Sequence, residues 1–497
     1  MKKKLTLLGF FSLTIATVMD VYEYPIFATS QFHLIFYLII GGFFWFIPTA
    51  LCSAEMATID GWEEGGVFTW VKNTIGERFG FVAIFAQWFQ ITIGFVTMLY
   101  FIVSALSYAI DIPIINQNPI IKLVTIVAIF WIITVLQFRG TSATQLIAKI
   151  GSVCGIILPA VLLVILSAIY LLNGNPSQLD TNNISWIPDF SQPATLVIFV
   201  SFMLSYMGVE ASSSFVNELD NPKRNYPIAM FMVVVATILI NAIGGLAIAN
   251  VIPQDQLSLS GGIIQGFEIL FGSSLQILTK IVALMIAFGV IAEISSWVVG
   301  PARGMYVVAQ KGLLPPIFRK VNKNNVPVVF ITFQGIIVTL WAAVLTLGSG
   351  GNNLSFTIAI SLATVVYVIT YLLLYAGYLV FTIKMADLPR GYTFGNKPFK
   401  IIIAILGLTT TIFALVISFI PPSTLSSGDA VIYQVILYSS FAFAAALPFV
   451  IYHFHDKKKH KTLLRKPSRI KAEEVNRFID PRARGEHEIQ PTEEDYL

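Results

Sequence analysis

Acidic and aromatic side chains inside long apolar stretches are the first candidates for chemistry in this sequence. Glu293 lies well inside such a stretch, and Trp297 follows four residues later. In a helix this spacing places both side chains on one face. A carboxylate beside an aromatic ring suits an ammonium group, through its charge and through cation–π attraction. The carboxylate could also carry or sense a proton. The alternative is a structural glutamate bonded to a neighbouring helix.

Two tyrosines repeat this spacing in a later apolar stretch. Tyr367 and Tyr371 are four residues apart, and both lie near the middle of their stretch. A tyrosine combines a flat apolar wall with a hydroxyl group, so these two could line a cavity together with Tyr22 and Tyr24. The alternative is that these tyrosines are interfacial or packing residues.

Two apolar stretches are interrupted by polar residues and by Pro or Gly. The first interruption, MDVYEYP at 19–25, contains Tyr22 and Glu23, and the second, SYMGVE at 205–210, contains Gly208 and Glu210. Charge inside a membrane is costly and usually marks function. These positions therefore predict broken helices with a site between them, although two simple kinks would give the same pattern. Glu55, at the end of its stretch, fits an interfacial group better.

The distribution of basic residues restricts the ligand. No Lys or Arg lies near the middle of any long apolar stretch. A permanent anion would find no fixed counter-charge there, whereas a zwitterion could place its carboxylate on the exposed N–H groups of a broken helix. The pattern therefore favours a net-neutral or cationic amino acid over an anion.

Composition predicts that the candidate residues lie in an all-α membrane protein. Of the 497 residues, 56% are hydrophobic and 12% are charged, which is too little charge for the surface of a soluble domain of this size. The apolar residues form blocks long enough to cross a bilayer as helices, since each crossing needs roughly 20 residues. The twelve blocks cover about residues 5–28, 33–57, 80–110, 119–138, 147–172, 194–216, 226–252, 275–301, 327–348, 354–383, 399–420 and 430–453.

The charged residues predict the orientation in the membrane. If the loops alternate between the two sides, the side with both termini holds 29 of the 31 Lys and Arg residues. Positive residues mark the cytoplasmic side. We therefore expect a multi-pass protein of the cell membrane with both termini in the cytoplasm.

The positions of the two interruptions predict the domain organisation. They fall in blocks 1 and 6, which are equivalent members of two five-helix halves at about 5–172 and 194–383. Because five is odd, the second half enters the membrane from the opposite side, which gives an inverted repeat. Two extra helices at 399–453 complete a twelve-helix transporter domain of residues 1–453, and a charged cytoplasmic tail of residues 454–497 follows.

Several motifs resemble those of a known superfamily. They are GWEEGGVFTW at 61–70, GVE at 208–210, NELDNPKRNYP at 217–227, GPARGMY at 300–306 and GLLP at 312–315. Together they resemble the amino acid–polyamine–organocation transporters, whose LeuT-like fold is a five-plus-five inverted repeat with helices 1 and 6 broken. Further stretches are similar to the bacterial glutamate/γ-aminobutyrate antiporters of acid-resistance systems. These are VYEYP at 21–25, FATS at 27–30, CSAEMAT at 52–58, AEISSW at 292–297 and PRAR at 481–484.

This resemblance implies roles for named residues. It implies that Tyr22, Glu293, Trp297, Tyr367 and Tyr371 line or gate the substrate path, and that Glu210 takes part in gating at the second break. It also implies that the tail plugs the cytoplasmic mouth at neutral pH, with Arg482 and Arg484 as anchors. A histidine is expected at position 476, where this chain has Asn476, while His487 lies nearby.

The expected function is proton-linked exchange of external glutamate for internal γ-aminobutyrate, active at acid pH and linked to a cytosolic glutamate decarboxylase. The nearest alternative is an exchanger of the same fold for another amino acid–amine pair. An enzyme would need a nucleophile–base pair or a metal cluster within the spans, and the sequence shows neither. A receptor or a channel stays possible in principle. We expect no metal, no cofactor and no nucleic-acid partner, only small amino acids and the lipid bilayer.

Overall fold

The computed structural model describes most of the chain. The described residues are 6–15, 18, 21–62, 66–139, 150–180, 184–210, 216, 219–324, 326–348, 351–423 and 425–464. The chain divides into two compact units, residues 1–449 and 450–497. The second unit is described only as far as Leu464, as the end of one helix.

The described part of the chain is helical and contains ten helices that are long and apolar enough to cross a membrane. The ten helices are α3–η2–α4 (His33–Ile40, Gly41–Phe46, Ile47–Ala57), α6 (Glu77–Ala109), α8 (Pro119–Gln137), η3–α10 (Ser152–Ile157, Leu158–Leu172), α14 (Pro222–Val251), α16 (Gln276–Gln310), α17 (Val328–Gly348), α18 (Asn352–Lys384), α19 (Lys397–Ser418) and α20 (Ser427–Leu464). Two of them contain a short π-helical segment, η2 in the first and η3 in the fourth. The prediction of a multi-pass helical membrane protein is confirmed.

The other two predicted blocks contain only short helices. In the first, α1 (Leu7–Ile15) is followed by a 3₁₀ turn, η1 (Val21–Glu23), and then by α2 (Tyr24–Ala28). Pro25 lies in the first turn of α2, where its missing N–H group is not needed for the helix. The residues of predicted block 1 therefore do not form one long helix.

The second interrupted block contains α11 (Pro193–Leu196) and α12 (Phe199–Leu204), followed by a turn at residues 205–208. Gly208 has a φ angle of 102°, which glycine adopts far more readily than any other residue. The turn is held in place because the Tyr206 hydroxyl donates a hydrogen bond of 2.8 Å to the carbonyl of Leu38 in α3. This turn positions the residues that follow it, above all Glu210.

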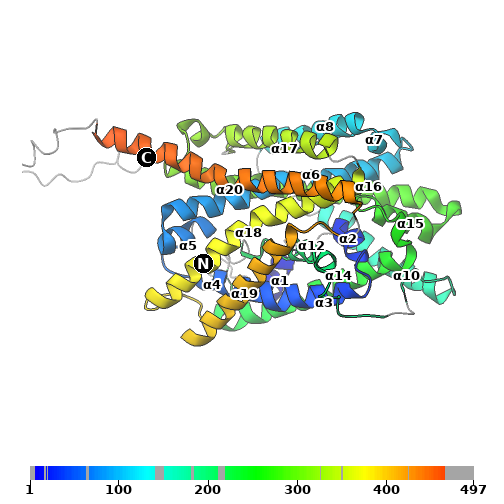
Figure 1. The fold of residues 1–497 in the computed structure, drawn as a ribbon, viewed down its shortest axis with the longest axis horizontal. Helices are drawn as coiled ribbons and strands as arrows, with labels where there is room; N and C mark the ends of the chain where they lie inside the picture. Colours follow the sequence, from blue (N-terminus) through cyan, green and yellow to red (C-terminus); the bar gives the residue numbers. More distant parts are fainter. Residues whose placement is uncertain are drawn as a thin grey trace, which may run out of the picture. The chain divides into compact units, whose positions relative to one another are not determined.

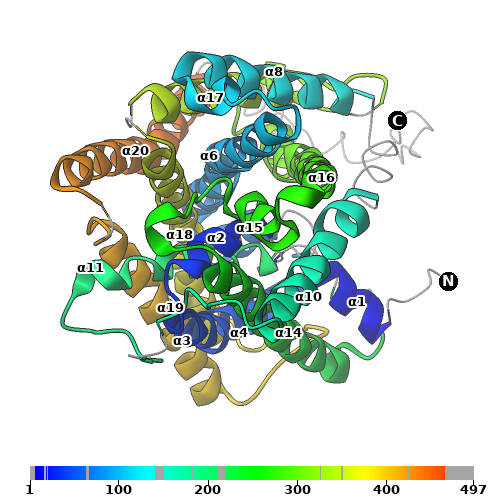
Figure 2. The same cartoon turned by 90° about the vertical axis from the view of Figure 1, so that its right-hand side faces the viewer.

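Within the first unit, α6 and α18 are the most buried of the ten long helices. They pack against one another, and α6 also packs against α16 (Figure 1). Figure 2 shows α2, α6 and α18 surrounded by other helices, among them α8, α14 and α19. Side chains from α6 and α18 can therefore meet the two interrupted segments in the interior.

Shorter elements connect the long helices. They are α5 (Gly66–Ile75), α7 (Ile114–Gln117), α15 (Gly262–Phe271), and the 3₁₀ turns η5 (Gln254–Gln256), η6 (Ser273–Leu275) and η7 (Pro316–Arg319).

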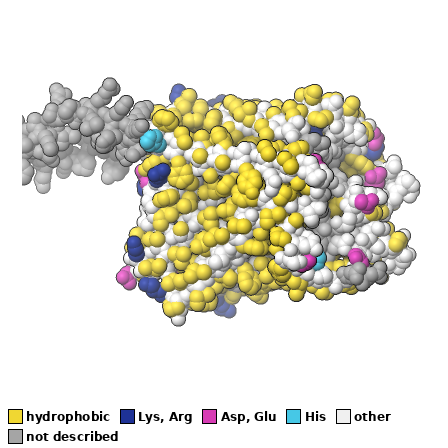
Figure 3. All heavy atoms as spheres, in the orientation of Figure 1, with side chains coloured by type: hydrophobic (Ala, Val, Ile, Leu, Met, Phe, Trp, Pro, Cys, Tyr) yellow, Lys and Arg dark blue, Asp and Glu magenta, His cyan; other side chains and the backbone are white. Residues whose placement is uncertain are grey.

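The surface of the long helices is apolar. Exposed side chains such as Phe231 of α14, Val416 of α19 and Val435 of α20 project outward. Figure 3 shows hydrophobic side chains over the middle of the face in view, with most Lys and Arg toward its left end and several Asp and Glu toward its right end. An apolar band between charged ends is the surface expected of helices that face lipid.

Candidate functional site

Glu210 lies directly after the turn of the second break and is 2% exposed. Three side chains donate hydrogen bonds to its carboxylate. The Tyr367 hydroxyl donates to Oε1 at 2.5 Å, the Tyr371 hydroxyl to Oε2 at 2.7 Å, and the Gln87 amide to Oε1 at 2.8 Å. Tyr367 and Tyr371 come from α18 and Gln87 comes from α6, so two buried helices fix this carboxylate at the break. We call these four residues the Glu210 cluster.

The cluster is also bonded to the backbone of the break. The N–H group of Gly208 donates a hydrogen bond of 3.0 Å to the Tyr371 hydroxyl. The Tyr371 hydroxyl thus accepts a hydrogen bond from Gly208 and donates one to Glu210. Through these two bonds Tyr371 connects α18 to the turn and to the carboxylate that follows it. The Trp45 ring packs edge-on against Tyr371, with ring centroids 4.7 Å apart.

Sequence analysis placed Tyr367 and Tyr371 on one helix face, and this is confirmed by ring centroids 4.9 Å apart and by their common partner. It missed Gln87. The only signal was a polar amide inside the apolar helix α6, and such residues are common enough in long helices that the sequence offered no reason to choose it. Among the described residues, no Lys, Arg or His forms an ion pair with Glu210.

The candidates of the first break lie in the 3₁₀ turn η1. Tyr22 and Glu23 are both buried in η1, and the Tyr22 ring lies near Phe101 of α6, with centroids 6.2 Å apart. The following helix α2 lies very close to α14. A Cβ atom on Gly244 would come within 2.4 Å of the Tyr24 ring, so only glycine allows this approach.

Glu293 and Trp297 lie on the continuous helix α16 and are both half-buried. Their spacing in an unbroken helix confirms the predicted common face. One turn earlier, the α16 backbone touches the π-helical segment η3. A Cβ atom on Gly289 would lie 2.7 Å from the backbone carbon of Gly155. This contact between two glycines fixes the position of α16 where Glu293 projects from it.

Glu55 differs from the sequence-based expectation of an interfacial group. Its carboxylate is 0% exposed and accepts from the Tyr378 hydroxyl at 2.6 Å and from the Thr393 hydroxyl at 2.9 Å. It also forms ion pairs with Arg390, at 3.1 Å, and with Lys400. We call these five residues the Glu55 cluster. The expectation was wrong because three of its partners, Thr393, Arg390 and Lys400, come from the segment around the start of α19, more than 300 residues away in the chain.

The candidates in the tail cannot be placed. Arg482, Arg484 and His487 lie outside the described residues, as does Asn476. The proposed plug therefore stays a prediction from the sequence.

The arrangement defines a class of protein. A buried carboxylate and aromatic hydroxyls meet at an interrupted segment of a multi-pass helical membrane protein, as in transporters that bind substrate at broken helices. A sequence profile of the amino acid permease family matches residues 5–441. The chain belongs to this family.

The chain is similar over its whole length to two proteins named glutamate/γ-aminobutyrate antiporter. One, from Lactococcus lactis subsp. lactis strain IL1403, is 53% identical, and the other, from Lactococcus lactis subsp. cremoris strain MG1363, is 54% identical. In both cases the similarity covers 100% of this chain and 99% of the relative. An uncharacterised transporter of Legionella pneumophila is 30% identical over 92% of this chain and 98% of its own length.

Proposed function

We propose that this chain exchanges external glutamate for internal γ-aminobutyrate across the cell membrane by alternating access. The observation that carries the proposal is the Glu210 cluster, a buried carboxylate at a helix break with three neutral donors and no described cation in ion-pair contact. A site of this kind can accept the ammonium group of an amino acid without first breaking a salt bridge. The similarity to two glutamate/γ-aminobutyrate antiporters supports the choice of substrates.

The proposed binding mode uses both polar groups of the break. The substrate ammonium approaches Glu210, while its carboxylate competes with the Tyr371 hydroxyl for the N–H group of Gly208. Displacement of Tyr371 would loosen the connection between α18 and the break. Binding would thereby favour the movement that opens the opposite side of the membrane. Tyr22, Glu23, Glu293 and Trp297 are proposed to line or gate the rest of the path.

The proposed architecture has twelve crossings in a five-plus-five inverted repeat, followed by two extra helices. Both termini are placed in the cytoplasm, because the loops on that side hold nearly all of the Lys and Arg residues. This proposal is supported by the ten long helices, to which the two interrupted segments would add two further crossings.

Proton linkage follows from the charges of the two substrates. The net charge of external glutamate approaches zero as the pH falls, and a cytosolic decarboxylase consumes one proton as it forms γ-aminobutyrate. The product then leaves with net positive charge, so each cycle removes a proton from the cytoplasm. We therefore propose a role in acid resistance.

The direct test is uptake of labelled glutamate by proteoliposomes that contain γ-aminobutyrate. We expect uptake at pH 5 that is accelerated by internal γ-aminobutyrate, which distinguishes an exchanger from a channel or a receptor. Absence of glutamate uptake at pH 5 would reject the proposal. If another amino acid–amine pair exchanges faster in a competition panel, the alternative substrate pair is correct.

The tail is proposed to close the cytoplasmic mouth at neutral pH through Arg482, Arg484 and His487. Histidine and carboxylates become more positive as pH falls, so the charge of this tail changes in the relevant range. Removal of residues 470–497 should extend exchange toward neutral pH. An unchanged pH profile of the truncated protein would contradict the plug.

A further inference from the structure

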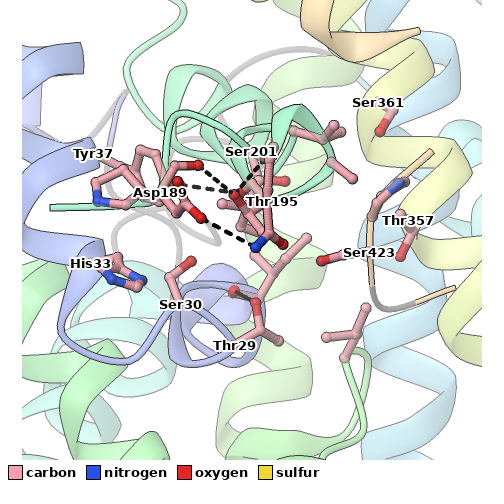
Figure 4. A pocket seen from close by; sticks show the side chains of 18 residues that line it. Thr29, Ser30, His33, Tyr37, Asp189, Thr195, Ser201, Thr357, Ser361 and Ser423 are labelled. Atoms are coloured by element: carbon pink, nitrogen blue, oxygen red, sulfur yellow. Dashed lines mark hydrogen bonds between the residues drawn. The ribbon is translucent and has the colours of Figure 1, made fainter. Parts of the chain in front are cut away.

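A polar cavity lies where the segment after α2 meets α11 and α12. Its volume is about 310 Å³, at the lower end of the range for ligand pockets, which suits a small metabolite. Its wall includes Thr29 and Ser30 just after α2, Thr195 and Ser201 in α11 and α12, and Ser361 in α18 (Figure 4). The cavity therefore touches the two interrupted blocks and the helix that supplies Tyr367 and Tyr371.

The described lining of this cavity carries one carboxylate, Asp189, and one imidazole, His33, and it contains no Lys or Arg. Most of its other polar groups are hydroxyls. Such a lining offers several hydrogen-bond partners and a single negative charge, which complements an ammonium group better than an anion.

Asp189 is held in a fixed orientation and keeps room for a ligand. Its Oδ1 accepts from the backbone N–H of Ser191 at 2.9 Å and from the Ser191 hydroxyl at 2.7 Å, and its Oδ2 accepts from the Gln192 amide at 3.1 Å. A carboxylate has about four acceptor positions, so at least one remains. The donors of Ser191 and Gln192 lower the pKa of Asp189, and its negative charge therefore persists at lower pH than usual.

Ser30 is a second, independent indication that this cavity binds a polar group. Its side chain lies in the cavity wall and is 8% exposed, and its hydroxyl oxygen has no hydrogen-bond partner among the described residues. Figure 4 shows the hydroxyl of Ser30 and the carboxylate of Asp189 facing one another, with His33 beside Ser30. A buried hydroxyl without a partner is unfavourable by about 1–3 kcal/mol, and a bound polar ligand would remove this cost.

We propose that this cavity is an outer binding site for the ammonium group of an amino acid, which holds the substrate between the outside and the Glu210 cluster. Asp189 binds the ammonium group and Ser30 donates a hydrogen bond to the substrate. The inference rests on the proposed exchange function for the identity of the substrate, but its binding step can be measured without transport.

The kinetic test compares Asp189→Asn with Asp255→Asn in proteoliposomes. Asp255 is an exposed acidic residue outside this cavity. At saturating internal γ-aminobutyrate, Asp189→Asn should raise the KM for external glutamate about fivefold to tenfold and change the maximal rate less than twofold, while Asp255→Asn should change neither. Equal KM values in all three proteins would overturn the proposal.

Ser30→Ala separates a ligand contact from a structural role. If Ser30 donates to the substrate, its removal should raise the KM about threefold. If the hydroxyl is only an unsatisfied group, Ser30→Ala should raise the melting temperature and leave the KM unchanged, which would contradict the proposal.

Binding is tested without transport by labelling Ser423→Cys, which lines the same cavity, in a Cys154→Ser background. The reagents, applied from outside, are cationic (2-trimethylammonium)ethyl methanethiosulfonate and its anionic sulfonatoethyl counterpart, and each rate is divided by that reagent's rate with a free thiol in solution. The normalised rate should be higher for the cationic reagent, and γ-aminobutyrate should slow the reaction. Asp189→Asn should abolish both effects. Equal normalised rates for the two reagents, unaffected by γ-aminobutyrate, would overturn the proposal.

The two proposals fail in different ways. If wild-type proteoliposomes exchange no glutamate, the proposed function fails, and the labelling rates still decide whether the cavity binds amines. If wild-type exchange is normal but neither the KM nor the labelling depends on Asp189, only the outer site fails.

Discussion

Two buried carboxylates, Glu55 and Glu210, are both surrounded by hydrogen-bond donors, but among the described residues only Glu55 has cations beside it. Arg390 and Lys400 balance its charge, and the Glu55 cluster connects α4, α18 and the segment around the start of α19. The described donors to Glu210 are two tyrosines and a glutamine, all of them neutral. Burial of a carboxylate is therefore not in itself a mark of function. The charge of its partners matters more. A buried carboxylate with neutral partners can receive a cationic ligand, whereas one that is already paired with cations stabilises the fold.

The largest expected effect on stability comes from the Glu55 cluster. Glu55→Gln leaves Arg390 and Lys400 next to each other without a counter-charge, so the free energy of unfolding should fall by about 3–5 kcal/mol. The measurement is the melting temperature of the purified protein. Loss of Lys400 as well, in Glu55→Gln/Lys400→Gln, should restore part of the stability. A single variant as stable as wild type would show that the ion pairs contribute little.

Glu210→Gln should have the opposite profile. The change removes the proposed partner of the substrate ammonium, and hydrogen bonds to charged groups contribute about 1.5–3 kcal/mol. Glutamate/γ-aminobutyrate exchange should therefore fall roughly 10- to 100-fold, since 1.4 kcal/mol corresponds to a factor of ten. No described cation loses a partner, so the melting temperature should stay within a few degrees of wild type. Exchange at the wild-type rate would remove Glu210 from the substrate site.

The two tyrosines should differ from one another. Tyr367→Phe removes one donor to Glu210, whereas Tyr371→Phe also removes the acceptor for the N–H group of Gly208. A hydrogen bond to a charged group contributes at least about 1.5 kcal/mol, so exchange should fall roughly tenfold in the first variant and more in the second. The initial rate of glutamate uptake measures both. If Tyr367→Phe lowers the rate of uptake more than Tyr371→Phe does, the claim that Tyr371 connects α18 to the break is wrong.

The smallest effect is expected at the ion pair of Lys72 and Glu77, which lies 3.3 Å apart with both side chains about one-third exposed. Exposed pairs contribute about 0–1 kcal/mol. Glu77→Gln should leave the melting temperature and the exchange rate nearly unchanged. A loss of stability as large as that of Glu55→Gln would mean that burial does not explain the contrast between ion pairs in this protein.

The sequence predicted those features of the site that depend on residues close together in the chain. Pro25 and Gly208 indicated where the helices are interrupted, and the spacing of Tyr367 and Tyr371 indicated their common face. These predictions depend on backbone geometry over a few residues, which a sequence records directly.

The sequence could not predict partners that are distant along the chain. Gln87 reaches Glu210 from another helix, and Lys400 reaches Glu55 from the start of α19. Both contacts depend on how helices pack in three dimensions. The sequence separated Glu55 from Glu210 by position alone, as an interfacial group at the end of its stretch, and so missed the ion pairs that hold Glu55 in the interior.

The most direct test of the central claim measures glutamate uptake at pH 5 by γ-aminobutyrate-loaded proteoliposomes that contain Glu210→Gln or Glu55→Gln/Lys400→Gln, each at equal folded protein. We predict that Glu210→Gln loses exchange while the Glu55 double variant retains most of it. Wild-type uptake by Glu210→Gln, or equal loss in both proteins, would contradict the claim that Glu210, the carboxylate with no described cation beside it, is the one that receives the substrate.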